Sequence, residues 1–319
     1  MASAGLRLRT IRATAFLLTA LSLMVVLLSA YLRLDGAGLG CADWPACYGR
    51  LLASEPGELH FGVVRLLHRA VASISLVLAC ALVWQCWRRP SIESAAGPAT
   101  LLLLLMLLLS ALGIWSSDPR LTLVGFLNIM GGLGLVTFSW RVVLASSPGS
   151  TLHSHAAPTR TLRLGAAALS VTVILGALMG ASYAALACAS FPDCGGRWWP
   201  GADDWAALEP FAVLATTPTA GDPGGATLHL LHHYSALATL LLLGAAALQA
   251  LADDARRHAA WVLLLLLVVE IALGSLAVLS GFNLWLAVSH DVGAAALLAS
   301  VATLLRRQPW TDKKETAAV

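Results

Sequence analysis

Charged residues are scarce in this chain: Asp, Glu, Lys and Arg make up 12% of its 319 residues. Soluble globular domains carry about 25% of these residues, so the composition argues against a soluble fold. The formal net charge of +3 at pH 7 is also too small to indicate a nucleic acid as partner. Hydrophobic residues make up 58% of the chain, and the mean hydropathy is +0.79. The sequence therefore indicates an integral membrane protein whose main contact is lipid.

Long apolar segments recur along the chain, each able to cross a hydrocarbon layer about 30 Å thick. They lie at 14–34, 61–85, 99–115, 121–144, 164–187, 227–250, 260–280 and 285–305. We expect each to form a transmembrane helix, which makes the fold an all-α membrane protein with eight transmembrane helices.

Basic residues gather before the first segment and in every second connection after it. These are Arg7, Arg9, Arg12, Arg88, Arg89, Arg141, Arg160, Arg163, Arg256, Arg257, Arg306, Arg307, Lys313 and Lys314. Because basic residues stay on the cytoplasmic side, we expect both termini in the cytoplasm, most simply of a bacterial cell. The first segment also has the form of a cleaved signal peptide. Its counterpart in the middle of the chain argues against that interpretation.

An internal repeat relates the two parts of the chain. Leu32–Gly49 and Met179–Gly196 each follow an apolar segment and each hold a C-x5-C pair with a proline two places before the second cysteine. One helix later, the stretch RLLHRAVAS from Arg65 matches HLLHHYSALA from His229. The repeat predicts two pseudosymmetric four-helix bundles, at 1–146 and 164–319, joined by a cytoplasmic linker at 147–163.

Four of the six cysteines form the two outer pairs, Cys41 with Cys47 and Cys188 with Cys194. The short spacing is compatible with disulfide distances, and the outer face is the oxidising side in bacteria. A thiol redox pair remains an alternative. A zinc site is another, with His60 as a further ligand, although zinc would need more ligands close by. Cys80 and Cys86 are expected to be small buried hydrophobic residues inside the second segment.

Histidine inside a membrane segment is costly, so it indicates a function. His232 and His290 are predicted at equal depth on the sixth and eighth helices, where two imidazoles suit the two axial positions of a heme iron. His68 lies at a similar depth in the first half. The alternative is that each histidine hydrogen-bonds across helices. Zinc or copper would require more ligands at that depth.

Other polar residues lie near these histidines. His229 is one helical turn outward of His232, where it could line the site, contact a propionate, relay a proton or lie at the interface. Arg65 is one turn outward of His68, and Glu270 lies in the middle of the seventh segment. A buried carboxyl group is usually paired, protonated or functional.

The first half lacks a second histidine. When Gly134 is aligned with Gly293, Gly131 falls where His290 lies. A heme in the first half would therefore be five-coordinate, differently ligated or absent. An open iron position suits a reacting or transient heme better than a fixed electron carrier.

At these residues the sequence resembles the heme A synthase family over nearly the whole chain. The resemblance is carried by GCADWPAC from Gly40, by His68 and Arg69, by LACASFPDCGGRWWP from Leu186, by the HxxH motif from His229, and by His290. It implies that His232 and His290 hold a heme b, and that the first half takes heme O as substrate, with His68 as one ligand. The implied reaction oxidises a heme methyl group to a formyl group for cytochrome oxidase.

The implied partners are heme O synthase or oxidase assembly factors, and the apolar surface also allows oligomerisation. Two departures from the family pattern fall in the first half, where Arg65 replaces a glutamate and Gly131 or Gly132 replaces a histidine. Glu58, two turns further out, is a poor geometric substitute, so the catalytic residue near His68 and Arg65 stays unassigned. The alternative function is a catalytically altered heme-binding membrane protein acting in heme carriage, sensing or electron transfer. A transporter without heme is a weaker third interpretation.

Overall fold

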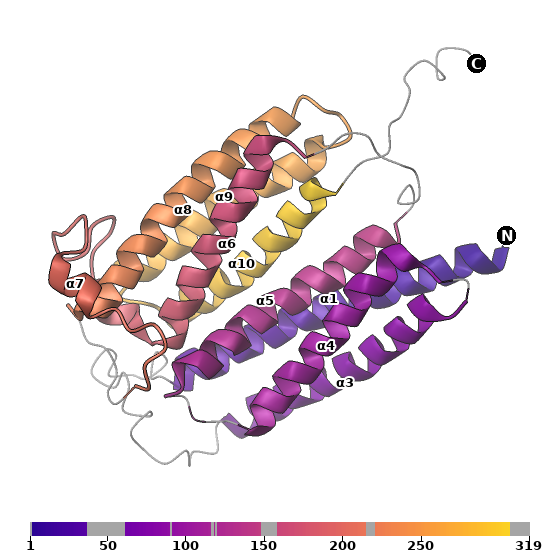
Figure 1. Ribbon diagram of the computed structural model, residues 1–319, viewed down its shortest axis with the longest axis horizontal. Coiled ribbons are helices and arrows are strands. Elements are labelled where there is room, and N and C mark those ends of the chain that lie inside the picture. The colour runs from indigo at the N-terminus through magenta and orange to yellow at the C-terminus, as the bar shows by residue number, and fades with distance from the viewer. Residues whose placement is uncertain are drawn as a thin grey trace.

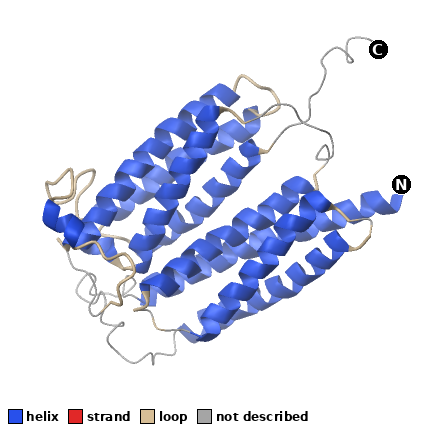
Figure 2. Ribbon diagram, viewed as in Figure 1, coloured by secondary structure: helices blue, strands red, loops and turns tan. Residues whose placement is uncertain are grey.

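The computed structural model describes residues 2–36, 61–89, 91–115, 118, 120–147, 158–214 and 221–306. Within these ranges the regular structure is helical, and Figure 2 shows no strand in the part of the chain that it colours. The expected all-α class is confirmed.

Eight long helices account for most of the described chain. They are α1 (Ala2–Gly36), α3 (Phe61–Trp87), α4 (Glu93–Trp115), α5 (Thr122–Ala145), α6 (Arg160–Ala181), α8 (Pro223–Ala250), α9 (Arg257–Leu279) and α10 (Leu284–Leu305). Each is long and apolar enough to cross a membrane, so the prediction of eight spans is confirmed. Large hydrophobic side chains such as Leu104, Leu241 and Leu265 are exposed, as expected of surfaces that face lipid.

The long helices lie in two sets (Figure 1). Helices α1, α3, α4 and α5 pack together and are called the first group; α6, α8, α9 and α10 pack together and are called the second group. Each group has its own apolar core, with Leu18, Leu82 and Leu102 buried in the first and Leu243 and Leu263 in the second. The groups meet where α1 and α5 pack against α6 and α10.

The first helix is longer than its apolar segment predicts, because it begins at Ala2 rather than near residue 14. Its added turns are held by Arg7, whose Nε lies 3.1 Å from the carbonyl oxygen of Gln85 and whose Nη2 lies 2.7 Å from that of Arg88. These carbonyls end α3 and have no partner inside their own helix, so a guanidinium there satisfies them.

The fifth segment is shorter than predicted, because α6 ends at Ala181 rather than at residue 187. Tyr183 has φ 52°, a left-handed conformation that stops the α-helix, and a 3-10 turn, η1 (Ala184–Ala187), follows. The chain thereby leaves the helix early enough to place Cys188 over the second group.

Capping residues set the starts of the two helices that carry His232 and His290. The side chain of Asp222 accepts a hydrogen bond from the backbone N–H of Gly225 at 2.7 Å, and Pro223 takes the first position of α8. Asn283 caps α10 in the same manner through the backbone N–H of Trp285 at 3.0 Å. Such caps replace hydrogen bonds that the first helical turn lacks.

One cysteine prediction is wrong. Cys86 is buried in the core of the first group, as expected, but Cys80 is exposed on α3. Six residues separate the two positions, and at about 100° per residue they point about 120° apart around the helix. Burial of one side chain therefore leaves the other on the surface.

Candidate functional site

His232 of α8 and His290 of α10 face each other in the second group. Their ring centroids lie 6.3 Å apart and their planes make an angle of 87°. With a metal–nitrogen bond of about 2.0–2.1 Å and a ring nitrogen about 1.1 Å from its centroid, two imidazoles on opposite sides of one metal ion have centroids about 6 Å apart. The observed separation fits a pair of axial ligands.

Each imidazole ring lies against a glycine of a neighbouring helix. A Cβ atom on Gly176 of α6 would be 3.0 Å from Cε1 of His232, and one on Gly274 of α9 would be 3.0 Å from Cε1 of His290. Any side chain at either position would push the ring away. The two glycines therefore provide bare backbone surfaces on which the rings lie.

The same two helices supply oxygen atoms for Nδ1 of each ring. Nδ1 of His232 lies 3.1 Å from the carbonyl oxygen of Thr172, and Nδ1 of His290 lies 3.2 Å from Oε1 of Glu270. Thr172 and Glu270 each precede the supporting glycine by four residues. The contact of His232 is a hydrogen bond, of the kind that fixes the tautomer and orientation of metal-binding histidines, whereas the contact of His290 is a close approach without hydrogen-bond geometry. Within the described ranges no hydrogen bond engages Nε2 of either ring, so this atom is the one suited to bind a metal.

Glu270 is held beside His290 by close packing. Its side chain is 11% exposed, and its carboxylate lies directly against the backbone of Gly293, where a Cβ atom would collide with it. Gly293 lies one helical turn after His290 on α10. Because Gly293 has no side chain, the carboxyl group of Glu270 fits against it and faces the imidazole of His290.

A charge from the first group reaches the residue next to His290. Nη2 of Arg33 in α1 lies 2.5 Å from Oδ2 of Asp291, and Nη1 donates to the carbonyl oxygen of Gly180 at 3.1 Å. Arg33 thus contacts α6 and α10 at the same level as the histidine pair.

In the first group, His68 lies on the interior-facing side of α3. Val64, Val71 and Ala72, which are its neighbours three or four residues away, pack on the core of the first group, and His68 itself is half-buried. Arg65 is exposed. Glu58 and His60 lie outside the described residues, so their relation to His68 is a prediction.

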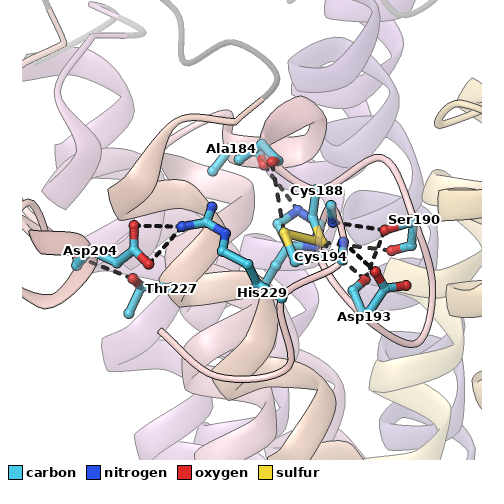
Figure 3. Close-up of a disulfide and its surroundings, with 12 residues drawn as sticks. Ala184, Cys188, Ser190, Asp193, Cys194, Asp204, Thr227 and His229 are labelled. Carbon is cyan, nitrogen blue, oxygen red and sulfur yellow. Dashed lines mark hydrogen bonds and ion pairs between the residues drawn. A yellow bond between two sulfur atoms is a disulfide. The ribbon is translucent and has the colours of Figure 1, made fainter. Parts of the chain in front are cut away.

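The predicted second disulfide is present. Cys188 and Cys194 are bonded (Figure 3), with their Cα atoms 5.0 Å apart. Both cysteines are buried in one apolar cluster with Ala226 and Leu230. The disulfide therefore lies on the first turns of α8. Cys41 and Cys47 lie outside the described residues, and their disulfide stays a prediction.

His229 connects α8 to the chain that precedes the disulfide. Its side chain is 1% exposed, and Nε2 lies 2.9 Å from the carbonyl oxygen of Ala184, as Figure 3 shows. Its ring also meets that of Phe282 edge to face at 5.8 Å. These contacts hold η1 onto the second group. The predicted roles of His229 toward a heme stay predictions.

An ion pair beyond the disulfide was not anticipated from the sequence. Nη1 of Arg197 lies 2.8 Å and 2.7 Å from the two carboxylate oxygens of Asp204, in the short helix α7 (Ala202–Ala206). Asp204 also accepts from the backbone N–H of Gly201 at 2.8 Å. The hydrogen bond from the Gly201 N–H, and to a smaller extent the contact with Arg197, hold the pKa of Asp204 below its ordinary value of 3.8.

Sequence reasoning found both histidines and Glu270 but missed their supports. Thr172 and Gly176 in α6 have the same four-residue spacing as Glu270 and Gly274 in α9. That shared spacing is a signal present in the sequence, but its meaning depends on which helices are neighbours.

The fold and the site together define a class: a membrane protein of eight helices with two imidazoles facing each other inside one helix group. The model of the COX15-CtaA family, described as cytochrome oxidase assembly protein, matches residues 12–302. This chain therefore belongs to that family.

Curated relatives carry a consistent description. The heme A synthase of Shewanella oneidensis is 28% identical over 310 residues, which cover 89% of this chain and 92% of the relative. The heme A synthase of Bacillus pumilus is 25% identical over 200 residues, covering 58% of this chain and 63% of the relative. That of Symbiobacterium thermophilum is 32% identical over 123 residues, covering 38% of this chain and 37% of the relative.

Proposed function

We propose that this chain is a heme A synthase, a membrane enzyme that converts heme O to heme A for cytochrome oxidase assembly. The observation that carries the proposal is the pair His232 and His290, whose ring separation of 6.3 Å fits axial ligation of one iron. Membership of a cytochrome oxidase assembly family supports the reaction and its purpose.

The second group is the proposed site of a resident heme b. His232 and His290 would hold it through Nε2, and the bound heme would supply one-electron redox chemistry. The carbonyl oxygen of Thr172 would keep the Nδ1 proton of His232 in place and so aim Nε2 at the iron, and the carboxyl group of Glu270 lies beside Nδ1 of His290. Gly176 and Gly274 leave the rings room to lie directly against the backbone of α6 and α9.

The first group is the proposed substrate site. His68 faces its interior and would ligate the iron of heme O. The reaction removes electrons and protons from a heme methyl group and adds an oxygen atom from water, which yields the formyl group of heme A. The released electrons require an oxidant from outside this chain.

We further propose that residues 1–146 and 164–319 are the two halves of the molecule, with 147–163 as a cytoplasmic linker. The start of α1 and the end of α10 lie at one end of the molecule, and α7 lies at the other (Figure 1). With basic residues in the first turns of α1 and after α10, this arrangement supports cytoplasmic termini and an outer disulfide. Heme O synthase and oxidase assembly factors are the proposed partners.

A second candidate is a heme-binding protein that carries or senses heme or transfers electrons without turnover. It is favoured by Arg65, because an arginine one turn from His68 cannot act as a base at ordinary pH. A carboxylate at that position could accept protons from the reacting methyl group.

The deciding experiment is mass analysis of hemes extracted from membranes that contain this chain and a heme O synthase. We expect heme A or its hydroxylated intermediate, which membranes with the heme O synthase alone would lack. Unconverted heme O together with a bis-histidine heme spectrum of the purified chain would reject the enzyme and support the second candidate.

A further inference from the structure

Two helix pairs, one in each group, contact each other through equivalent residues. In the second group, Gly274 of α9 lies against His290 of α10, and one turn away Glu270 lies against Gly293. In the first group, Leu109 of α4 lies against Gly131 of α5, and one turn away Leu105 lies against Gly134.

These contacts place the two helix pairs in the same register. His290 and Gly293 are three residues apart on α10, as Gly131 and Gly134 are on α5. The partners are four residues apart in both cases, Glu270 and Gly274 on α9 and Leu105 and Leu109 on α4. Two independent contacts therefore assign Gly131 to the place of His290, and Leu109 to the place of Gly274.

Each helix pair has one large and one small residue at this contact, but the large residue is on α10 in the second group and on α4, the other helix of the pair, in the first group. In the second group α10 contributes an imidazole and α9 contributes bare backbone. In the first group α5 contributes bare backbone and α4 contributes a leucine, whose Cδ2 would be 2.5 Å from a Cβ atom on Gly131. Leu109 thus fills the space that a second axial histidine would need. A glycine in place of the histidine, with no larger residue opposite, would leave a cavity that lowers stability. Leu109 fills that space, so α4 and α5 stay packed.

His68 lies on α3, which packs against α4 in the same group. Its helical neighbours Val64, Val71 and Ala72 pack on the apolar cluster that also includes Leu105 and Leu109. The first group therefore combines one imidazole on α3 with an apolar surface on α4. The second group combines two imidazoles and a carboxylate.

We propose that the first group binds its heme on one side only, through His68, with Leu109 and Leu105 forming an apolar surface toward the other face of the heme. This assignment rests on the proposed function and specifies how its substrate is held. A heme bound through one histidine keeps an exchangeable iron position, whereas two axial histidines occupy both positions. Leu109 is then the residue that distinguishes the substrate site from the resident site.

The test is electron paramagnetic resonance of the purified full-length chain loaded with ferric heme b as the probe. We expect one low-spin heme and one high-spin heme per chain. His68→Ala should abolish the high-spin signal and leave the low-spin signal intact. The double variant Leu109→Gly with Gly131→His should convert the high-spin signal into a second low-spin signal. Gly131→His alone should not, because Leu109 blocks the histidine.

Several results would overturn the assignment. They are two low-spin hemes in the unaltered chain, a high-spin signal that survives in His68→Ala, or a second low-spin heme in Gly131→His alone. The unaltered chain and His68→Ala keep the test decisive even if the double variant fails to fold. Heme A production is measured separately, so a chain that makes heme A with two low-spin hemes refutes only this inference. A one-sided heme without heme A production refutes only the proposed reaction.

Discussion

Neighbouring residues in the second group offset part of the free-energy cost of burying two imidazole rings in a membrane protein. A polar ring in an apolar interior is stable only when its nitrogen atoms find partners. Nδ1 of His232 has a backbone carbonyl as hydrogen-bond partner at 3.1 Å, whereas a carboxyl oxygen of Glu270 lies 3.2 Å from Nδ1 of His290 without hydrogen-bond geometry. The two imidazoles therefore differ in their polar surroundings.

Removing either imidazole should remove the stably bound heme. For His232→Ala and His290→Ala we expect the heme content of the purified protein to fall at least about tenfold, since even loss of a ligand's supporting partner weakens metal binding about 10–100-fold. The optical spectrum and the heme-to-protein ratio measure this. His233→Ala is the matched control, because its ring packs on Phe191 with centroids 5.2 Å apart. Normal bis-histidine spectra in both alanine variants would disprove the site.

Whole elements position these residues through short interhelical approaches. Helices α6 and α9 come close to the rings only because Gly176 and Gly274 lack side chains. The disulfide, His229 and the Arg197–Asp204 pair then hold the chain between α6 and α8 against the start of α8.

A methyl group at a supporting glycine should disturb the site without removing a ligand. Gly274→Ala places a Cβ atom 3.0 Å from the ring of His290, so we expect weaker heme binding and an altered low-spin signal in electron paramagnetic resonance. Gly244→Ala in α8 is the control, because no atom lies within 4 Å of its Cβ position. An unchanged signal in Gly274→Ala would show that the backbone contact does not orient the ring.

The local stability of the segment around α7 should depend on pH. The pKa of Asp204 is lower in the folded protein than its ordinary value of 3.8, so its ion pair contributes stability above that pH. This stability is lost as the pH falls through the lowered pKa. We expect hydrogen exchange in residues 197–206, corrected for intrinsic rates, to be constant from neutral pH to about pH 5 and faster below 3.8. Asp204→Asn should show the faster exchange already at neutral pH; equal exchange in both proteins at every pH would contradict this.

At the scale of the whole molecule, polar contacts connect the two groups across an otherwise apolar interface. Arg33 reaches Asp291 and Gly180, and Nε1 of Trp140 in α5 donates to Oγ1 of Thr303 in α10 at 2.7 Å. The two contacts lie toward opposite ends of α10. Together they favour one relative placement of the groups over the alternatives that apolar surfaces alone would allow.

Breaking the Arg33 contact should destabilise the assembly of the two groups. Arg33→Met leaves Asp291 without its cation, and we expect a loss of about 1–2 kcal/mol, since both side chains are only partly exposed. Thermal unfolding of the purified protein measures the loss. Adding Asp291→Asn should recover part of it. Arg120→Met is the control, because Arg120 and its partner Asp118 are more exposed, at 54% and 35%, than Arg33 and Asp291. An equal loss of stability in Arg33→Met and Arg120→Met would show that the interface ion pair stabilises the protein no more than the exposed pair does.

The number and class of the helices, the cysteine pair Cys188–Cys194 and the pairing of His232 with His290 could all be predicted from the sequence. Apolar length, basic residues at helix ends and residue spacing are local properties, so they can be read along the chain. The sequence did not predict the exposure of Cys80 or the added turns of α1 that Arg7 holds, because both depend on packing against neighbouring helices.

The surroundings of the histidines could not be predicted in this way, because they depend on how the helices pack. Thr172, Gly176, Glu270 and Gly274 acquire their roles because α6 and α9 lie beside α8 and α10, and sequence order does not specify which helix faces meet. The same is true of Leu109, whose contact with Gly131 cannot be predicted from its position in a leucine-rich segment. Lipid-facing and protein-facing leucines are the same residue type, so only the contact between helices tells them apart.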